Sequence, residues 1–406
     1  ALPAVSIDGP KAVGKTATAL RRAGAVIALD DPDEVTLLAA DRKRIDRMSS
    51  PVLIDEWQRY APVWDMVRRS VDRDQSPGRF LLTGSASPKQ NPTHSGAGRI
   101  VRLRMRPMSL AERALITPTV SLAALLSGER PEVGGDSSLR TEDYVEEILR
   151  SGFPAIRTLD ERNRVDVLDG YLAGIVERDF PEQGHVVRRP SVLRAWLQAY
   201  AAATATTASY NVVLDAASSG DGDKPAKTTT IAYRDVLTQL WLLDPVPGWL
   251  PTLNHFARLS QPPKHHLVDP ALATRLLGVG VDALLSNVTA GPPIPRDGPL
   301  LGSLFESLVT LSVRVYAQPA PASVHHLRTH RGDHEVDLIV AREDGRVVAF
   351  ETTLSPSVGD DEVKHLRWLR KQMGDDLLDA AVITTGKAAY RRPDGIAVIP
   401  AALLSP

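Results

Sequence analysis

The feature that most constrains this chain is a glycine-rich segment close to its start, where residues 4–20 read AVSIDGPKAVGKTATAL. A short apolar run leads into the segment from Gly9 to Thr16, and an alanine-rich helical pattern follows it. This is the phosphate-loop sequence G-x-x-x-x-G-K-[ST], in the strand, loop and helix context that supports such a match. The chain is therefore expected to begin with a nucleotide-binding α/β unit.

Each residue type in this loop has a chemical part in holding a nucleotide. Gly9 and Gly14 let the backbone wrap closely enough for successive N–H groups to point at phosphate oxygens. Lys15 would reach the β- and γ-phosphates, Thr16 would offer its hydroxyl to Mg²⁺, and the helix N-terminus would add its positive dipole end. We predict that ATP, with Mg²⁺, binds to nine consecutive residues: Gly9, Pro10, Lys11, Ala12, Val13, Gly14, Lys15, Thr16 and Ala17.

A second apolar run, within SPVLIDEWQ at residues 50–58, ends in two adjacent carboxylates. Asp55 would hold Mg²⁺, usually through water, and Glu56 would polarise the attacking water as a general base. Taken alone, the pattern also fits a strand followed by a helix N-cap. The phosphate loop upstream favours the catalytic interpretation.

A third apolar run ends in hydroxyl groups, in GRFLLTGSAS at residues 78–87. In P-loop ATPases of the AAA type, a polar residue at this place senses the γ-phosphate, so Thr83 and Ser85 are the candidates. Simple turn chemistry is the alternative interpretation, because Gly and Ser are common turn residues. Both remain open from the sequence.

The segment GRIVRLRMR at residues 98–106 alternates strictly between apolar and basic side chains, as a strand with two different faces does. The apolar face would carry Val101, Leu103 and Met105, and the basic face Arg102, Arg104 and Arg106. The basic face is either a solvated sheet surface or a ridge for phosphates or a neighbouring subunit. Arg99, at the mouth of the strand, is the candidate arginine finger, acting in cis or in trans. The expected catalytic residues are therefore Lys15, Glu56, Thr83 and Arg99, on a parallel sheet with helices on both faces.

The middle of the chain changes to helical patterns. Helices are expected over 107–126, 143–149, 164–178, 192–203, 211–217 and 229–243. An extended return after Leu242 would form a wing, which makes a winged-helix module one interpretation. The presumed recognition helix carries only Arg234 as a basic residue, whereas phosphate neutralisation by Lys and Arg dominates DNA affinity. A simple packing module is the alternative.

The last region follows a Pro- and Gly-rich stretch at 291–299 and has an α-β-β-β-α-β order. The expected elements are a helix at 300–316, strands at 324–328, 335–341 and 346–353, a helix at 361–373 and a strand at 380–385. This order resembles the core of the PD-(D/E)xK nucleases. Glu306, Asp337 and Glu351 fall where that superfamily places its metal-binding carboxylates, and three such oxygen ligands would suit Mg²⁺. Thr353 stands where the motif has its lysine, and Lys364 is the nearest substitute.

Composition sets the outer limits of these interpretations. A length of 406 residues suggests two or three domains, which we place at 1–110, 111–290 and 291–406. The net charge of −1 gives no global basic field, so any nucleic-acid site must be a local patch. The chain has no cysteine, which excludes disulfides and Cys-ligated metals and agrees with a cytoplasmic location. No apolar stretch is long enough to span a membrane, so no membrane partner is expected.

These motifs together resemble one family. The order is the phosphate loop, Leu-Ile-Asp-Glu-Trp-Gln, Leu-Leu-Thr-Gly-Ser, Gly-Arg, Pro-Met-Ser-Leu-Ala-Glu, Ser-Gly-Phe-Pro, Arg178-Asp179, Pro263-Lys264-His-His-Leu-Val-Asp269 and Glu-Val-Asp…Phe-Glu-Thr-Thr. It looks like the bacterial and archaeal AAA-type ATPases that carry a C-terminal domain of unknown function, DUF4143. The resemblance covers nearly the whole chain. It implies an AAA-type ATPase domain, a winged-helix-like middle and a restriction-endonuclease-like α/β tail.

The implied function is ATP binding and hydrolysis coupled to a partner, for which nucleic acid (DNA or RNA) and a second copy of the chain are the candidates. The alternatives are an ATP-regulated, metal-dependent nuclease and a DNA-binding nucleotide switch. A scaffold that binds nucleotide but hardly hydrolyses it is disfavoured by Asp55 and Glu56. The missing lysine at Thr353 favours the ATPase whose tail serves as a binding module.

Overall fold

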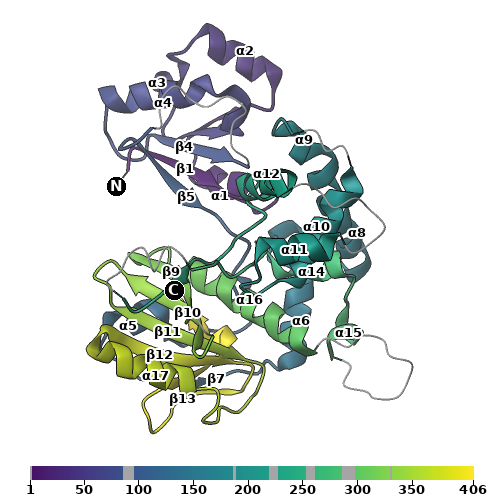
Figure 1. Ribbon diagram of the computed structural model, residues 1–406. Helices are drawn as coiled ribbons and strands as arrows, with labels where there is room; N and C mark the ends of the chain where they lie inside the picture. The colour runs from purple at the N-terminus through teal and green to yellow at the C-terminus, as the bar shows by residue number, and fades with distance from the viewer. Residues whose placement is uncertain are drawn as a thin grey trace.

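The computed structural model describes residues 2–85, 96–185, 189–218, 227–252, 261–285, 298–329 and 332–406. Figure 1 shows an N-terminal α/β region at the top, helices from the middle of the chain at the side, and a second sheet near the C-terminus at the bottom. Ser87, at the end of the expected third strand, lies outside the described residues, as does most of the 291–299 stretch.

The first sheet has five strands that pair in parallel in the order β2-β3-β4-β1-β5. They are β1 (Ala4–Asp8), β2 (Ala25–Ala28), β3 (Val52–Asp55), β4 (Phe80–Gly84) and β5 (Ile100–Arg104). Because all five run in the same direction, the loops after β1, β3 and β4 leave the sheet at one edge. The phosphate loop, the carboxylates of Asp55 and Glu56, and the hydroxyl groups of Thr83 and Ser85 therefore lie at the same edge.

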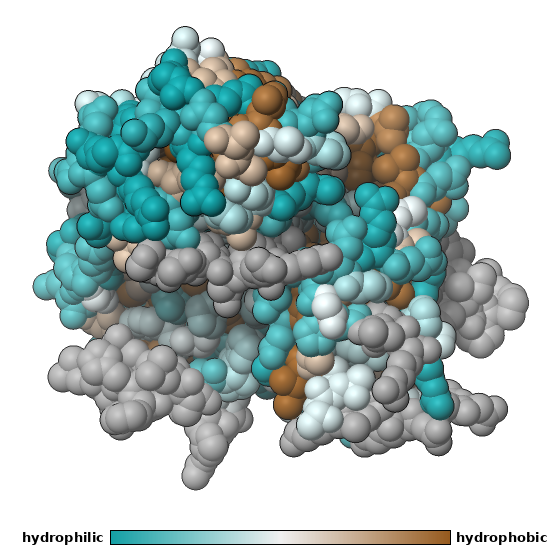
Figure 2. All heavy atoms as spheres, turned by 90° about the horizontal axis from the view of Figure 1, so that it is seen from above, coloured by the Kyte–Doolittle hydropathy of each residue, from teal (hydrophilic) through white to brown (hydrophobic). Residues whose placement is uncertain are grey.

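Apolar side chains cover both faces of this sheet, as the alternation of strands and helices predicted. The helices of the region are α1 (Lys15–Leu20), α2 (Pro32–Ala40), α3 (Arg44–Arg47) and α4 (Pro62–Arg73), with a 3₁₀ turn at Trp57–Tyr60. Val63, Val67 and Val71 of α4 pack with β3 and β4 in one core, while Ile7, Ala19 and Leu53 form a second core. Figure 2 views this end of the molecule from above and shows a mainly hydrophilic surface with small apolar areas.

The segment 107–126, predicted as one helix, is mostly irregular, and that prediction was wrong. Only a 3₁₀ turn at Ala111–Arg113 and α5 (Leu122–Ser127) are helical, separated by β6 (Val120–Ser121). Its backbone N–H groups pair with distant residues instead: Leu110 N donates to Ser312 Oγ at 3.1 Å, and Thr119 N to Leu403 O at 3.0 Å. Tertiary contacts with the end of the chain therefore override a local helical pattern.

The middle region packs its helices around one large core that it shares with the tail. The helices are α6 (Thr141–Arg150), α7 (Pro154–Arg157), α8 (Glu161–Gly174), α9 (Phe180–Glu182), α10 (Pro190–Ala202), α11 (Tyr210–Ala217), α12 (Lys227–Gln239), α14 (Pro270–Leu277) and α15 (Val281–Leu285), with a π turn at Ile175–Asp179. After α12, the chain returns extended and forms two antiparallel bridges, Leu243 with Leu267 and Val246 with Lys264.

The tail forms the centre of an eight-stranded mixed sheet in the order β7-β13-β14-β12-β11-β10-β9-β8. Its strands are β9 (Ala322–Arg328), β10 (Glu335–Arg342), β11 (Val347–Thr353), β12 (Leu377–Thr384), β13 (Ala388–Arg391) and β14 (Ala397–Pro400); β15 (Leu404–Ser405) pairs with β6. β7 (Gly135–Asp136) and β8 (Gly248–Trp249) come from the middle region and extend the sheet beyond the predicted strands.

Helices cover both faces of this second sheet. α16 (Gly298–Tyr316) and α5 pack on one face, and α17 (Lys364–Met373) packs on the other. The predicted α-β-β-β-α-β order is present, and the Asp344-Gly345 turn joins β10 to β11, with Gly345 at a φ of 86°. In the described part of the chain, no helix has both the length and the apolar character needed to cross a membrane.

Candidate nucleotide-binding site

The phosphate loop follows β1 directly, and its two glycines are required by the backbone. A Cβ on Gly9 would lie 2.3 Å from the carbonyl oxygen of Met105, at the end of the neighbouring strand β5. Gly14 caps α1 with a φ of 99°, a left-handed conformation that glycine adopts without strain. The loop therefore turns sharply over the end of the sheet and delivers Lys15 and Thr16 into the first turn of α1.

Lys15 is buried within this loop, with 6% of its surface exposed. Its Nζ donates to the carbonyl oxygens of Gly9 at 2.9 Å and Pro10 at 2.7 Å. Burial lowers the pKa of Lys15 to about 8, although the nearby carboxylates of Glu56 and Asp55 oppose the shift. A buried ammonium held chiefly by neutral carbonyl oxygens is well suited to an incoming anion.

Asp55 accepts hydrogen bonds from two hydroxyl groups at the edge of the sheet. Thr16 Oγ1 donates to Asp55 Oδ1 at 2.7 Å, and the hydroxyl of the fully buried Thr83 donates to the same oxygen. Three predicted site residues from α1, β3 and β4 therefore meet at one point. Their donor atoms are all oxygens, the ligand type that Mg²⁺ prefers, so the residues present fit a magnesium ion.

Glu56 adopts a left-handed backbone conformation, with a φ of 53°, immediately after β3. Its carboxylate accepts hydrogen bonds from Ser85 Oγ at 3.1 Å and from the side-chain amide of Gln58. The buried indole of Trp57 packs against Gly84, where a Cβ would lie 2.7 Å from Trp57 Nε1. After this left-handed turn, the carboxylate of Glu56 meets the hydroxyl of Ser85, just after β4, whereas Asp55 meets the hydroxyl of Thr83.

Arg99 is not part of this cluster. It precedes β5, which pairs in parallel with β1 so that Ala4 lies opposite Ile100 and Asp8 opposite Arg104. Arg99 is therefore at the opposite edge of the sheet from the phosphate loop, where its Nε lies 2.8 Å from Asp72 Oδ1. Within one chain the predicted contact with the γ-phosphate is wrong; only the arrangement in trans stays a prediction.

The basic side chains of the same strand also have other partners. Arg104 and Arg106, with Arg314 from α16, all bind the buried carboxylate of Asp244, at 2.9, 2.7 and 2.9 Å. Burial alone would raise the pKa of Asp244, but the three guanidinium groups lower it well below its ordinary value. These two arginines therefore form neither a solvated face nor a free phosphate ridge, and instead join the first region to the middle and the tail.

Two residues of the middle region contact the phosphate loop, which local sequence patterns did not indicate. The ammonium of Lys11 forms an ion pair with Asp179, in the π turn after α8. Pro154, at the start of α7, lies against Gly14, where a Cβ would be 3.6 Å from the proline ring. The loop is therefore enclosed by the motifs Ser-Gly-Phe-Pro and Arg-Asp, whose role the sequence left unassigned.

Asp269 holds the segment that carries this proline. Its carboxylate accepts from Ser151 Oγ at 2.9 Å and Gly152 N at 2.6 Å, and its other oxygen caps α14 through Ala271 N. Gly152 in turn accepts from Met108 N at 2.8 Å. Three of the motifs that carry the family resemblance therefore meet beside the nucleotide site, although they are far apart in the sequence.

A cavity of about 470 Å³ continues from the phosphate loop along α1. Its walls come from all three regions of the chain and include Val13, Ala17, Met105, Pro154, Val315 and Gln318. Gln318 follows α16, and its amide donates to Arg104 O at 2.5 Å. Beside Gly14 its wall is apolar, formed by the side chains of Met105 and Pro154.

The structure also brings together the carboxylates predicted in the tail. Glu306 on α16 and Asp337 on β10 line a second cavity of about 430 Å³, and Glu351 lies nearby on β11. Lys264 of the middle region lies among them, with its Nζ 2.7 Å from Glu306 Oε1 and 3.1 Å from Asp337 Oδ1. In the described ranges, no three His, Cys, Asp or Glu side chains are arranged to hold a metal ion. A lysine therefore stands where the sequence predicted a second magnesium ion.

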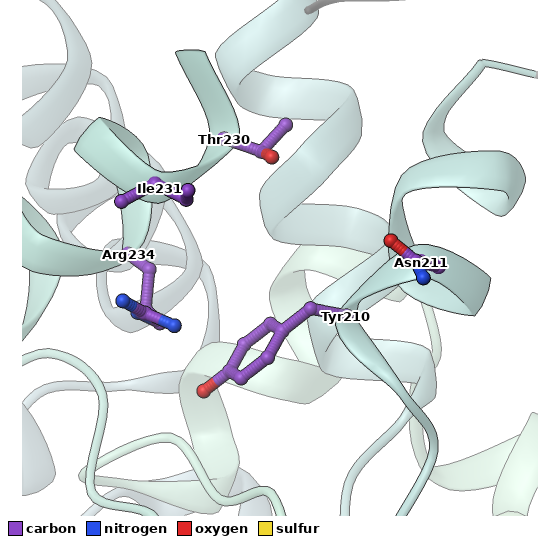
Figure 3. Close-up of a pocket in the computed structure, with 5 residues that line it drawn as sticks. All are labelled: Tyr210, Asn211, Thr230, Ile231 and Arg234. Atoms are coloured by element: carbon purple, nitrogen blue, oxygen red, sulfur yellow. The ribbon is translucent and has the colours of Figure 1, made fainter. Parts of the chain in front are cut away.

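A third hollow, of about 280 Å³, lies between α11 and α12 (Figure 3). Arg234 points toward Tyr210 there, with its guanidinium carbon 5.2 Å from the ring centroid, and it also binds Asp235 at 3.1 Å. Arg234, the basic residue that the sequence singled out in the presumed recognition helix, thus already has partners. This arrangement favours packing over DNA reading for α12.

Comparison with known proteins agrees with this organisation. Residues 2–114 match the model of an AAA domain, residues 301–404 that of the domain of unknown function DUF4143, and residues 141–283 that of the domain of unknown function DUF8612. Uncharacterized proteins of Mycobacterium tuberculosis (Rv2008c) and Mycobacterium bovis (Mb2031c) are each 27% identical over 408 residues, covering 98% of this chain and 80% of the relative.

Two solved structures share low overall similarity. The Walker-type ATPase PABY2304 of Pyrococcus abyssi aligns over 68% of this chain and 91% of its own, with 15% identity and a TM-score of 0.39. The ORC2 protein of Aeropyrum pernix, solved as ADPNP–ADP complexes, aligns over 69% and 87%, with 14% identity and a TM-score of 0.27. The family matches pair an AAA domain at residues 2–114 with DUF4143 at residues 301–404, the combination that the sequence predicted.

Proposed function

We propose that this protein binds ATP with Mg²⁺ at the phosphate loop and hydrolyses it. The observation that carries the proposal is the convergence on Asp55: Thr16 and Thr83 both donate to its Oδ1. Buried Lys15 stands in the same first turn of α1 and is poised to meet the phosphates. When bound, Mg²⁺ would neutralise charge on the phosphate oxygens and act as a Lewis acid.

The residues around Glu56 support hydrolysis rather than binding alone. Its carboxylate is oriented by Ser85 and Gln58, and the strained backbone after β3 fixes its direction. A carboxylate placed in this way accepts a proton from water and so acts as the general base. Thr83 orients Asp55, and Lys15 stabilises negative charge that develops on the phosphate oxygens.

The nucleoside part of ATP is proposed to lie in the 470 Å³ cavity. Val13 and Ala17 lie in the loop and first turn of α1, so the cavity is continuous with the phosphate site. Met105 and Pro154 offer apolar surface for a base. Because Val315 belongs to α16, the tail would touch the nucleotide directly.

Coupling to the C-terminal domains is proposed to run through residues 264–269. At one end, Asp269 holds Ser151 and Gly152, and thereby Pro154 against the phosphate loop. At the other end, Lys264 enters the carboxylate cluster of the tail. One short segment therefore contacts both centres, which supports coupling between them.

The partner is proposed to be nucleic acid or a second copy of the chain. The three helices α10, α11 and α12, followed by the bridges of Leu243 and Val246, support a winged-helix-like module. Arg99 would act only from a neighbouring copy, because it lies at the far edge of its own sheet. A nuclease remains the second candidate, favoured by the convergence of Glu306 and Asp337 on an open cavity.

ATP turnover with and without single-stranded DNA, duplex DNA and RNA tests this proposal. The wild-type protein is expected to release phosphate in a Lys15-dependent manner, and its partner should change the rate. Absence of turnover under every condition would contradict the ATPase. Cleavage of end-labelled nucleic acid that disappears in Glu351→Ala but survives in Lys15→Ala would instead favour the nuclease.

A further inference from the structure

We infer that Lys264 is the resident cation of the tail's carboxylate cluster, and that this cluster is a metal-free ionic joint between the middle region and the tail. The cluster is defined here as Glu306, Glu335, Asp337 and Glu351 around Lys264. Lys264 Nζ lies 2.7 Å from Glu306, 3.1 Å from Asp337 and 3.4 Å from Glu335. This inference does not depend on ATP hydrolysis.

The backbone fixes Lys264 in this position. Lys264 N donates to Val246 O and Val246 N donates to Lys264 O, both at 2.9 Å. Only 1% of the residue is exposed, so the ammonium has no access to bulk solvent in this conformation. A long side chain held at both its backbone and its ammonium has few alternative rotamers. It is therefore a built part of the cluster rather than a surface lysine that happens to lie near it.

The carboxyl groups of the cluster and the Lys264 ammonium shift one another's pKa values. Burial alone would lower the pKa of Lys264, but Asp337, Glu306 and Glu335 raise it well above its ordinary value. The pKa of Asp337 is lowered, because Lys264 and two hydrogen bonds from Thr352 outweigh its burial. Burial and the charge of Asp337 raise the pKa values of Glu306 and Glu351. The ammonium thus faces one firmly ionised buried carboxylate, Asp337, and two carboxyls, Glu306 and Glu351, that hold their protons more easily.

A divalent ion does not fit this arrangement. It would have to share the carboxylates of Glu306 and Asp337 with Lys264, and it would stand beside a buried positive charge that repels it. Thr353, at the end of β11, offers no charge in exchange. The disagreement with the metal site predicted from the sequence therefore has a specific cause. A lysine from outside the tail has taken the place of the cation.

The joint ties the tail to the segment 264–269. Removing the ammonium would leave a buried carboxylate without its partner, which is one of the more destabilising changes in a protein interior. Neutralising the partner as well would remove most of that penalty. Stability and metal binding therefore report on the inference independently of catalysis.

The test uses the full-length, nucleotide-free chain carrying Asp55→Asn, which weakens the magnesium site at the phosphate loop. Thermal unfolding is measured in EDTA and in excess Mn²⁺, and bound Mn²⁺ is counted by electron paramagnetic resonance. The protein is expected to show the same melting temperature in both solutions and no bound Mn²⁺ that depends on Glu306. Bound Mn²⁺ that is lost in Glu306→Gln would overturn the inference.

Lys264→Met, compared with the exposed Lys371→Met on α17, supplies the second measurement in the same background. Lys264→Met is expected to lower the melting temperature by roughly 5 °C or more, whereas the control changes it little. If Lys264→Met and Lys371→Met have the same melting temperature, the ammonium of Lys264 is dispensable for stability, and the proposed ionic joint is wrong. If Lys264→Met cannot be recovered folded, the Mn²⁺ measurement on the Asp55→Asn protein decides alone.

Discussion

Two lysines that are buried in the described part of the chain, Lys15 and Lys264, have opposite surroundings. Lys15 donates to two neutral carbonyl oxygens, and burial lowers its pKa to about 8. Lys264 binds carboxylates, which raise its pKa well above the ordinary value. The first site therefore holds a positive charge that lacks a strong counter-anion, while the second is already neutralised. The difference indicates that the phosphate loop can bind an anionic ligand, whereas the carboxylates of the tail cluster already have Lys264 as their counter-ion.

If the phosphate loop rather than the tail cluster is the catalytic site, the largest loss of ATPase activity should come from replacing Glu56. If the N-terminal site is the chemically active one, Glu56→Gln should still bind ATP but hydrolyse it about 10²- to 10⁴-fold more slowly, because a positioned general base is lost. Steady-state phosphate release and equilibrium titration measure the two properties separately. Glu343→Gln, an exposed carboxylate in the turn between β10 and β11, is the matched control. Unchanged turnover in Glu56→Gln would move the base to another residue.

A second prediction concerns stability at pH 7. The pKa of Lys15 lies below its ordinary value of 10.5, so its protonation destabilises the folded state, fully so below pH 8. Lys15→Met should therefore stabilise the protein by about 1–3 kcal/mol, less what the lost hydrogen bonds contribute. Chemical denaturation measures the change. The comparison with Lys264 would fail if Lys15→Met destabilised the protein as Lys264→Met is expected to do.

A third prediction follows from the same shift. The phosphates of ATP should raise the pKa of Lys15, so binding at pH 8 should take up about half a proton per site. Calorimetric titration in buffers of different ionisation enthalpy measures this uptake. Lys15→Arg keeps the charge at all accessible pH values and should bind ATP without uptake. Uptake that persists in Lys15→Arg would assign the proton to a different group.

The smallest expected effect concerns the contact between the loop and the middle region. Asp179→Asn removes the carboxylate that neutralises Lys11, leaving that ammonium free for a phosphate. ATP affinity should rise by up to about fivefold, since such partly exposed ion pairs contribute little. The gain should shrink at high salt. Weaker binding in Asp179→Asn would instead mean that the ion pair supports the shape of the loop.

The sequence could indicate that Thr16, Asp55 and Thr83 lie together because they belong to short motifs at the ends of neighbouring strands. Strand register then explains why the arginine-finger prediction failed within one chain: Arg99 comes just before β5, at the edge of the sheet opposite the phosphate loop. The contacts of Lys264 could not be predicted from the sequence for a different reason. Its partners Glu306 and Asp337 lie on later elements, and only the tertiary fold brings them together. The predicted helix at 107–126 failed because its backbone pairs with α16 and the C-terminus.

The most direct test of the central claim is a calorimetric titration of Mg-ATP into the wild-type protein and Lys15→Ala. The account predicts saturable binding of one nucleotide per chain in the wild type, and at least about 100-fold weaker binding in the variant, because the charged hydrogen bonds to the phosphates are lost. Thermal unfolding of both proteins confirms that each is folded. Equal affinity in the two proteins would contradict the assignment of Gly9 to Thr16 as the nucleotide site.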